Sequence, residues 1–244
     1  MTNRLVLAGS RVLVVGIGGL GCPAALALAR AGVGTIGIAD DDVVDAGNLH
    51  RQILFRDEDV GRPKVEAAAA ALLREVPNLR IERHATRMLP QNAVELASRY
   101  DVIVEGSDNF ATKFLAADAC RIAKKTVVHG AAVRWHGTAL AVSAIGGPCY
   151  RCLFEDLPRE NAPNCAEAGV VGPVVGIVGA VQADLAISLL GGEEVAGTLF
   201  TFDGKTLAAR RRKIPRRAGC PLCSEQRVIQ RIDATRYTSA IPNL

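Results

Sequence analysis

Hydrophobic and polar positions follow two different periods along the first half of the chain. Short runs that are apolar, or apolar at every second position, predict sheet strands at 11–15, 35–39, 80–84, 102–105 and 126–130. Helical spacing of apolar residues predicts helices between them, at 20–31, 60–75, 90–99 and 110–123. Regular alternation of strand and helix is typical of βαβ units on a parallel sheet.

The pattern changes after Gly130, where β-rich sequence continues without an intervening helix. The expected elements are a strand at 138–143, a loop at 146–164, a mostly apolar helix at 171–190, and a hairpin of strands 198–203 and 205–211. We therefore expect an α/β fold. Its Rossmann-like, doubly wound, mostly parallel sheet would carry an antiparallel C-terminal extension and a cysteine-bearing lobe.

The size and composition suit one domain with a substantial core. The chain has 244 residues, of which 49% are hydrophobic and 22% charged, a balance that excludes disorder as the dominant state. We expect a single domain over 1–244. Its parts would be a nucleotide-binding half at 1–135, a second half with the cysteine lobe at 136–224, and a tail at 225–244.

The basic character of the chain comes from one short segment. The net charge is +4, and six cations lie between Arg210 and Arg217, without which the net charge would be −2. A concentration of this kind argues against a broad nucleic-acid-binding face. Residues 1–10 show no secretory leader, and the longest nearly uncharged stretch, 169–182, is too short to span a membrane. We expect a cytoplasmic protein without a membrane span.

A glycine motif follows the first predicted strand. Residues 16–21 read Gly-Ile-Gly-Gly-Leu-Gly, which fits G-x-G-x-x-G between a strand and a helix and predicts a nucleotide phosphate site. Asp40 ends the second strand, where an acidic residue binds ribose hydroxyls. A dinucleotide-dependent dehydrogenase is the first hypothesis, but the sequence offers no convincing acid or base for hydride transfer. His129, alone at a strand end, is more often structural.

Further motifs follow in a fixed order. They are Gly-Asn-Leu-His-Arg-Gln at 47–52, Val-Gly-Arg-Pro-Lys at 60–64, Gly-Ser-Asp-Asn at 106–109, Gly-Ala-Ala at 130–132, and Cys-x-x-Cys pairs at 149–152 and 220–223. From Ser10 to Ser224 this set resembles the ThiF/MoeB/HesA superfamily of ubiquitin-activating-enzyme-like adenylyltransferases. The similarity is closest to the molybdopterin-synthase adenylyltransferases, with a related branch in thiamine biosynthesis.

The resemblance implies an ATP-dependent adenylyltransferase. Such enzymes join the C-terminal glycine carboxylate of a small β-grasp sulfur carrier ending in Gly-Gly to AMP and release pyrophosphate. Arg51 and Lys64 would then act on the phosphates, Asn48 would orient them, and Asp108 would be catalytic as the Mg²⁺ ligand. The nucleotide-binding set implied is Gly18, Gly19, Asp40, Asp42, Asn48, Arg51, Gln52, Lys64, Asp108 and Asn109.

The two Cys-x-x-Cys pairs indicate a metal site. Four thiolates from Cys149, Cys152, Cys220 and Cys223 would close a tetrahedral, structural Zn²⁺ centre. Free thiols and iron–sulfur ligation are the alternatives. Zinc would clamp the loop after Ser143 to the C-terminal segment.

Two further residues have a chemical role only by resemblance. Cys165 aligns with a loop cysteine that forms a persulfide link to the carrier in the thiamine branch, and a role without chemistry stays open. Arg4 is the candidate for the arginine that relatives send to the γ-phosphate across a dimer, although its context differs from their Arg-Tyr-x-Arg-Gln motif. Cys22 and Cys120 lie in helical patterns and are expected in the core.

The resemblance also implies partners. We expect a homodimer, a carrier protein, and a separate sulfur donor, because no rhodanese-like sequence follows Ser224. Two alternatives remain: activation of a peptide or a tRNA base, and a degenerate module that binds a carrier without adenylating it.

Overall fold

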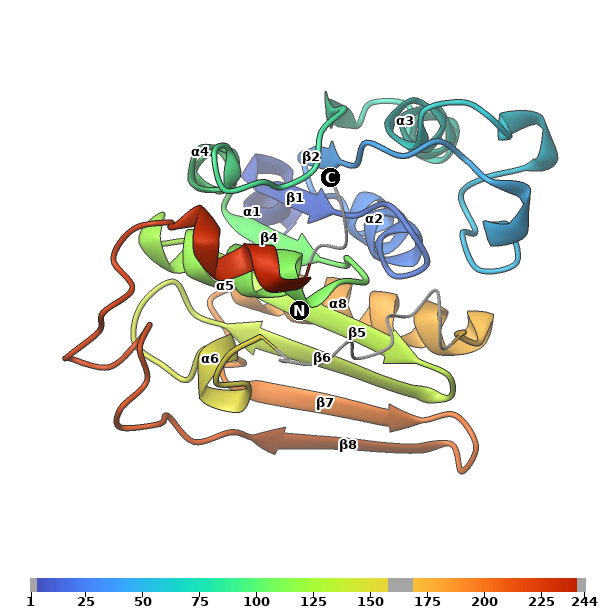
Figure 1. Cartoon of the computed structure of the whole chain (residues 1–244). Coiled ribbons are helices and arrows are strands. Elements are labelled where there is room, and N and C mark those ends of the chain that lie inside the picture. Colours follow the sequence, from blue (N-terminus) through green and yellow to red (C-terminus); the bar gives the residue numbers. More distant parts are fainter. Residues whose placement is uncertain (1–3, 158–168, 241–244) are drawn as a thin grey trace.

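The computed structural model describes residues 4–157 and 169–240, which form a single eight-stranded sheet with helices on both faces (Figure 1). The strand order is β3-β2-β1-β4-β5-β6-β7-β8. Pairs from β3 to β5 are parallel and pairs from β5 to β8 are antiparallel. The strands are β1 Arg11–Val15, β2 Thr35–Ala39, β3 Arg80–His84, β4 Val102–Glu105, β5 Thr126–Val133, β6 His136–Val142, β7 Thr198–Asp203 and β8 Ala208–Lys213. The expected α/β fold class is confirmed.

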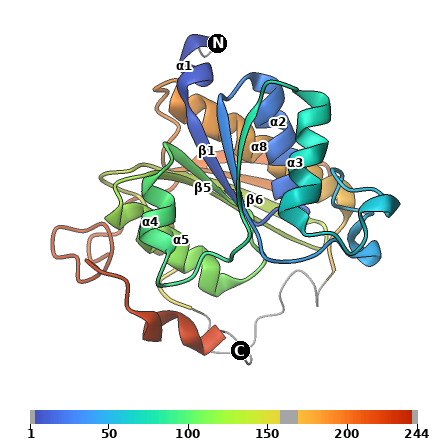
Figure 2. The same ribbon diagram turned by 90° about the horizontal axis from the view of Figure 1, so that it is seen from above.

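The helices form two layers. The helices of more than three residues are α1 Arg4–Gly9, α2 Gly21–Ala31, α3 Lys64–Glu75, α4 Ala93–Ser98, α5 Phe110–Ile122, α6 Tyr150–Leu153, α8 Gly172–Leu190 and the 3-10 helix η3 Ala234–Ala240. Helices α2, α3 and α8 pack against one face of the sheet, and α4 and α5 against the other (Figure 2). Each layer encloses its own apolar core, so the sheet is buried on both faces over its parallel half.

Several element boundaries differ from the sequence expectation: β5 continues to Val133, β6 spans His136–Val142 and α4 spans Ala93–Ser98. Helix α3 begins at Lys64, directly after Pro63, which pairs with Val43 in an isolated bridge and which the sequence pattern places near the helix start. Strand β8 begins at Ala208, because the hairpin turn extends to Leu207, whose φ of 56° lies in the left-handed region. The expected loop at 146–164 contains the short helix α6. Helix α1 had no counterpart in the sequence pattern.

Helix α8 packs very closely on its neighbours. A Cβ added at Gly179 would lie 2.4 Å from the carbonyl oxygen of Leu20, so the absence of a side chain allows α8 to contact the start of α2 backbone to backbone. Its Gln182 donates through Nε2 to the carbonyls of Glu105 (2.8 Å) and Val128 (3.2 Å), which ties α8 to β4 and β5. Among the described helices, α8 alone has the length and hydropathy of a membrane span. These contacts place it in the core.

The C-terminal tail belongs to the fold. Asp118 on α5 accepts two hydrogen bonds from Arg151 of α6, at 2.8 and 2.9 Å, and a third from the hydroxyl of Tyr237, at 2.7 Å. All three side chains are buried. The cysteine lobe and the tail are therefore fixed to the same point of α5.

Candidate active site

The glycine turn lies at the carboxyl end of β1, where the sheet order reverses between β1 and β4. This switch point is where open α/β sheets bind ligands. Gly16 has a φ of 82° and Gly21 begins α2 directly behind it, so a Cβ at Gly21 would lie 2.0 Å from the Gly16 carbonyl oxygen. Gly18 and Gly19 are partly exposed between them. The turn has the geometry that the motif predicts.

Asp40 closes this turn from the end of β2. Its two carboxylate oxygens accept hydrogen bonds from the backbone N–H groups of Ile17 (2.8 Å) and Asp42 (2.9 Å). Burial raises the pKa of Asp40, and the charge of Lys64 works in the opposite direction. Each oxygen retains a second acceptor position for a ligand hydroxyl.

Lys64 is fixed beside the turn by Asp42. Its ammonium donates to the Asp42 carboxylate at 2.8 Å, and its backbone N–H donates to the Asp42 carbonyl at 2.9 Å. The lysine side chain is only 7% exposed, whereas Asp42 is 53% exposed and also lies 3.7 Å from Arg87. Lys64 is thus a preorganised cation at the first residue of α3.

Asn48, Arg51 and Gln52 share one turn between β2 and α3. The Arg51 guanidinium donates to the Asn48 side-chain oxygen at 2.5 Å, and the backbone N–H groups of Arg51 and Gln52 both donate to the Asn48 carbonyl. Gln52 is buried, and the nitrogen of its amide would be 3.7 Å from a Cβ at Gly18. Its amide oxygen has no hydrogen-bond partner among the described residues. A buried amide oxygen without a partner, next to the glycine turn, fits a site for a bound nucleotide.

Asp108 reaches the same edge of the sheet from the end of β4. Its carboxylate is exposed and makes no hydrogen bond or ion pair within the described ranges 4–157 and 169–240. The neighbouring Asn109 accepts the backbone N–H of Thr112 at 2.8 Å and caps α5. A free carboxylate on a short, capped loop is suited to a hard cation such as Mg²⁺.

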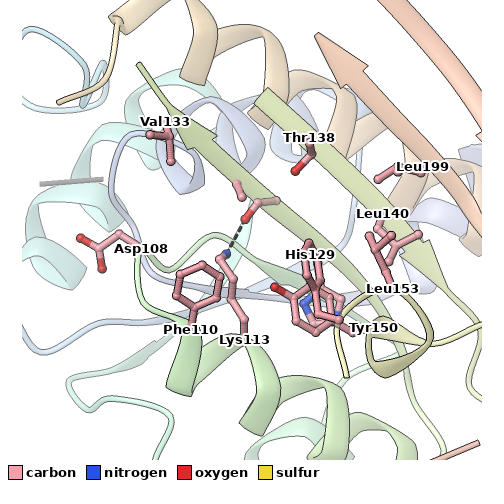
Figure 3. A pocket seen from close by; sticks show the side chains of 13 residues that line it. Asp108, Phe110, Lys113, His129, Val133, Thr138, Leu140, Tyr150, Leu153 and Leu199 are labelled. Carbon is pink, nitrogen blue, oxygen red and sulfur yellow. Dashed lines mark hydrogen bonds between the residues drawn. The ribbon is translucent and has the colours of Figure 1, made fainter. Parts of the chain in front are cut away.

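A pocket of about 180 Å³ begins beside Asp108 and extends under β5, β6 and β7 (Figure 3). Its wall is mostly apolar. Its lining includes Asp108, Ala131, Val133, Thr138, Phe154 and Leu199. The pocket therefore extends from Asp108, after β4, to the antiparallel half of the sheet.

A buried charge cluster supports the floor of this pocket. The carboxylate of Glu105, fully buried, lies 3.0 Å from the Lys113 ammonium and 3.2 Å from Nδ1 of His129. Lys113 also donates to the carbonyl of Gly130. Burial alone would raise the pKa of Glu105, but Lys113 and His129 outweigh it and lower that pKa to about 2. The sequence reading missed this cluster. The available signal was a lone Glu at the end of an apolar strand with a Lys on the buried face of the next helix.

The four cysteines of the two pairs converge. Sulfur–sulfur distances are 3.9 Å for Cys149–Cys152, 3.5 Å for Cys149–Cys220 and 3.4 Å for Cys152–Cys223. A tetrahedral zinc with bonds of about 2.3 Å places its sulfurs about 3.8 Å apart, so the four thiols fit one ion. They are too far apart for disulfides. The cluster could hold zinc.

The remaining predicted residues lie elsewhere. Cys22 and Cys120 are buried, as expected, and burial raises the pKa of the Cys22 thiol to about 12. Arg4 is exposed on α1, which precedes the amino end of β1, so it lies at the end of the sheet opposite to the glycine turn of its own chain. Cys165 lies outside the described residues.

Curated relatives share much of this sequence. Over 227 residues the chain is 43% identical to the adenylyltransferase and sulfurtransferase MOCS3 of Anopheles gambiae, covering 91% of this chain and 52% of that protein. It is 36% identical to the MOCS3 of Dictyostelium discoideum over 243 residues, covering 97% and 57%. The chain therefore spans about half the length of the curated relatives it matches.

Solved structures share the fold. The crystal structure of E. coli MccB superposes with a TM-score of 0.81 at 20% identity, covering 92% of this chain and 68% of that one. The structure of the same protein with ATP gives 0.78 at 22% identity, covering 91% and 68%. In sequence, residues 2–222 match the ThiF family. With that match over nearly its whole length and the glycine turn, Lys64 and Asp108 assembled at the switch point of the sheet, the chain belongs to the ThiF family.

Proposed function

We propose that this chain adenylylates the C-terminal glycine carboxylate of a small ubiquitin-like sulfur carrier, using ATP and releasing pyrophosphate. The observation that carries the proposal is the assembly of the glycine turn, the buried Lys64 and the free carboxylate of Asp108 at one edge of the sheet. Family membership and relatives named adenylyltransferase support it.

The chemistry explains why cations and a metal ligand are needed together. A carrier carboxylate oxygen forms a bond to the α-phosphorus of ATP, the bond from that phosphorus to the bridging oxygen breaks, and pyrophosphate leaves with the electron pair. The carrier carboxylate and ATP are both anions, and negative charge grows on pyrophosphate as it leaves. Fixed positive charge near the phosphates therefore lowers the barrier. Lys64 and Arg51 would supply that charge, and Asp40 would bind the ribose.

The donor sets fit two metals. Asp108 would hold Mg²⁺, which would neutralise phosphate charge when bound. Cys149, Cys152, Cys220 and Cys223 would hold Zn²⁺ in a closed site that keeps no position for substrate. Zinc would therefore be structural, and this chain's own groups would bind and orient the reactants.

The oligomeric state, the pathway and the cellular compartment are part of the same proposal. An apolar stripe on α8 supports a homodimer, in which Arg4 would act on the site of the partner chain. The carrier would belong to molybdopterin or thiamine biosynthesis, with sulfur from a separate donor. Reduced cysteines at a metal suit a cytoplasmic setting.

ATP–pyrophosphate exchange tests the function directly. With a carrier ending in Gly-Gly, wild-type protein should exchange label between pyrophosphate and ATP, and Asp108→Ala should lose about 10²–10³ in rate. ATP affinity should change much less, because the glycine turn, Asp40 and Lys64 remain. Glu95→Ala, which removes an exposed carboxylate from α4, is the matched control. Exchange by Asp108→Ala at the wild-type rate would contradict the role assigned to Asp108. Absence of exchange by the wild type would favour the alternative, a module that binds a carrier without adenylating it.

A further inference from the structure

The six cations between 210 and 217 separate into two groups. Four of them are held by their own chain, through the contacts Arg211–Asp184 at 3.3 Å, Lys213 to the carbonyls of Glu194 and Ala196 at 2.8 Å, Arg216 to the carbonyl of Cys223 at 2.5 Å, and Arg217 to the carbonyl of Arg151 at 3.1 Å. Arg210 and Arg212 are exposed, and their guanidinium groups make no hydrogen bond or ion pair with any described residue.

The alternation of β8 explains the difference. Arg211 and Lys213 point to the face covered by α8, whereas Arg210 and Arg212 point to the opposite face. In the antiparallel register Arg212 lies opposite Leu199, Leu199 opposite Leu140, and Leu140 opposite His129. Directly opposed residues share a face, so this row runs from the pocket wall to the edge strand.

A second row runs in parallel. Arg210 lies opposite Thr201, Thr201 opposite Thr138, and Thr138 opposite Ala131, which also lines the pocket. The Cα atoms of Arg210 and Arg212 are therefore about 7 Å apart along β8, and three strand spacings, about 14 Å, separate the backbone of β8 from the pocket wall on β5. In Figure 1, α6 lies in front of the start of β7 on this side, and none of the described helices covers β8 there.

We propose that Arg210 and Arg212 are specificity-determining residues that select carriers with carboxylates beside an apolar surface patch. The inference rests on the proposed function, because it takes the carrier's C-terminal carboxylate to react beside Asp108. A domain of about 100 residues has a radius of gyration of about 13 Å. A carrier of that size, with its C-terminal carboxylate beside Asp108, would place its folded domain over the face between the pocket and β8.

Charge and composition favour an acidic protein over a nucleic acid. Two cations, with the exposed apolar side chains of Val133 (37%) and Phe154 (44%) at the pocket, do not make a track for a phosphate backbone. They do match a protein patch in which acidic residues surround an apolar centre, since interface rims use charge to choose partners.

Charge reversal tests the proposal. Arg210→Glu/Arg212→Glu is compared with Arg74→Glu/Arg227→Glu, a control with the same charge change at exposed cations outside β8. The probes are two purified β-grasp carriers ending in Gly-Gly, one from molybdopterin and one from thiamine biosynthesis. In exchange assays at low salt, KM for the preferred carrier should rise about tenfold or more in the β8 variant alone. Because salt screens such contacts, the difference should shrink at 0.5 M NaCl.

The other parameters identify the cause. If kcat and KM for ATP stay at wild-type values in the β8 variant, and a carrier variant with lysines at its acidic patch restores KM, the assignment stands. A KM equal to that of the control variant overturns it, as does a loss confined to kcat. Loss of binding to single-stranded RNA with carrier KM unchanged also overturns it, in favour of a nucleic-acid face.

Failure of the proposed function gives a different result. In that case wild type shows no exchange with either carrier, and carrier binding is measured directly by calorimetry. Salt-sensitive binding that the β8 variant loses and the control keeps supports the docking role without adenylylation. Equal binding by both variants overturns it.

Discussion

Glu105 is the residue on which the floor of the pocket depends. Its carboxylate neutralises Lys113 and accepts from His129 in an environment with no exposed surface for the glutamate. Two charges buried at contact distance are costly to separate, because each would remain without a partner in a medium of low polarity. Ionised Glu105 therefore ties α5 and β5 to β4 beneath the pocket.

Acid should weaken this cluster in a defined range. A pKa of about 2 in the fold, against an ordinary value of 4.5, corresponds to about 3 kcal/mol of stability at neutral pH. Because the folded pKa is the lower one, this contribution is complete above about pH 4.5 and is lost as the pH falls towards 2. Urea unfolding at pH 6 and pH 3 measures the difference.

The control removes both charges together. Glu105→Gln/Lys113→Met should be close to wild type in stability at neutral pH and should lose less on acidification, whereas Glu105→Gln alone should cost about 3–5 kcal/mol. Parallel pH profiles for the wild type and the double variant would show that the pair has no such linkage.

Within the described ranges, Lys64 is held by a single neighbouring carboxylate. Asp42 holds Lys64 through both side chain and backbone. Asp42→Asn should keep the backbone bond and lose most of the charge interaction, so exchange should fall about tenfold, less than in Lys64→Met. Steady-state exchange with saturating carrier measures both. Equal losses would mean that Asp42 contacts the substrate itself.

At the scale of elements, the cysteine cluster joins two segments that have little other regular structure. Helix α6 has four residues, and the turn that carries Cys220 and Cys223 has no helix or strand of its own. Tyr150 and Leu222 pack into the apolar core beside α5, and a closed metal site would add a direct link between the two segments.

Metal analysis should find about one zinc per chain. Cys220→Ser should lose the zinc and lower Tm, while ATP affinity stays close to wild type because the glycine turn is built on other elements. Cys120→Ser, at a buried cysteine outside the cluster, should keep the zinc. Zinc-free protein with an unchanged Tm after chelation would refute a structural role.

The sequence predicted the strands of the sheet well, but it did not predict the contacts between elements that are distant in the chain. Five strands, 11–15, 35–39, 80–84, 102–105 and 198–203, have the bounds expected, because short apolar runs between turns leave few alternatives. The role of Arg210 and Arg212 could not be read in advance, since it depends on which face of β8 is covered by α8. The Glu105 cluster likewise needs β4, α5 and β5 to be adjacent, which only the fold provides. Site roles taken from the resemblance, such as that of Arg51, stay predictions.

At the scale of the whole molecule, α8 has a face that residues 4–157 and 169–240 leave exposed. Pro173, Ile177, Ala180 and Asp184 are exposed at helical spacing, and Ile177 is 38% exposed. A mostly apolar stripe on a core helix is suited to an isologous contact with a second copy.

Light scattering should therefore give about twice 25.7 kDa for the wild type. Ile177→Arg should shift the protein to monomer, whereas Leu207→Arg, at a hairpin residue that is 77% exposed, should not. A monomeric wild type at micromolar concentration would count against the dimer and against any contribution of Arg4 to a partner site.

The close packing of α8 has a consequence for synthesis of the chain. Val174, Val178 and Leu185 complete the same core as Val12, Leu28 and Val104, although about 70 residues or more separate them from those partners in sequence. When the first 135 residues have left the ribosome, the face of β4 and β5 that α8 covers is still exposed. A fragment ending there should be protease-sensitive and prone to aggregate, since the nucleotide-binding half acquires a stable core only after residue 190 emerges.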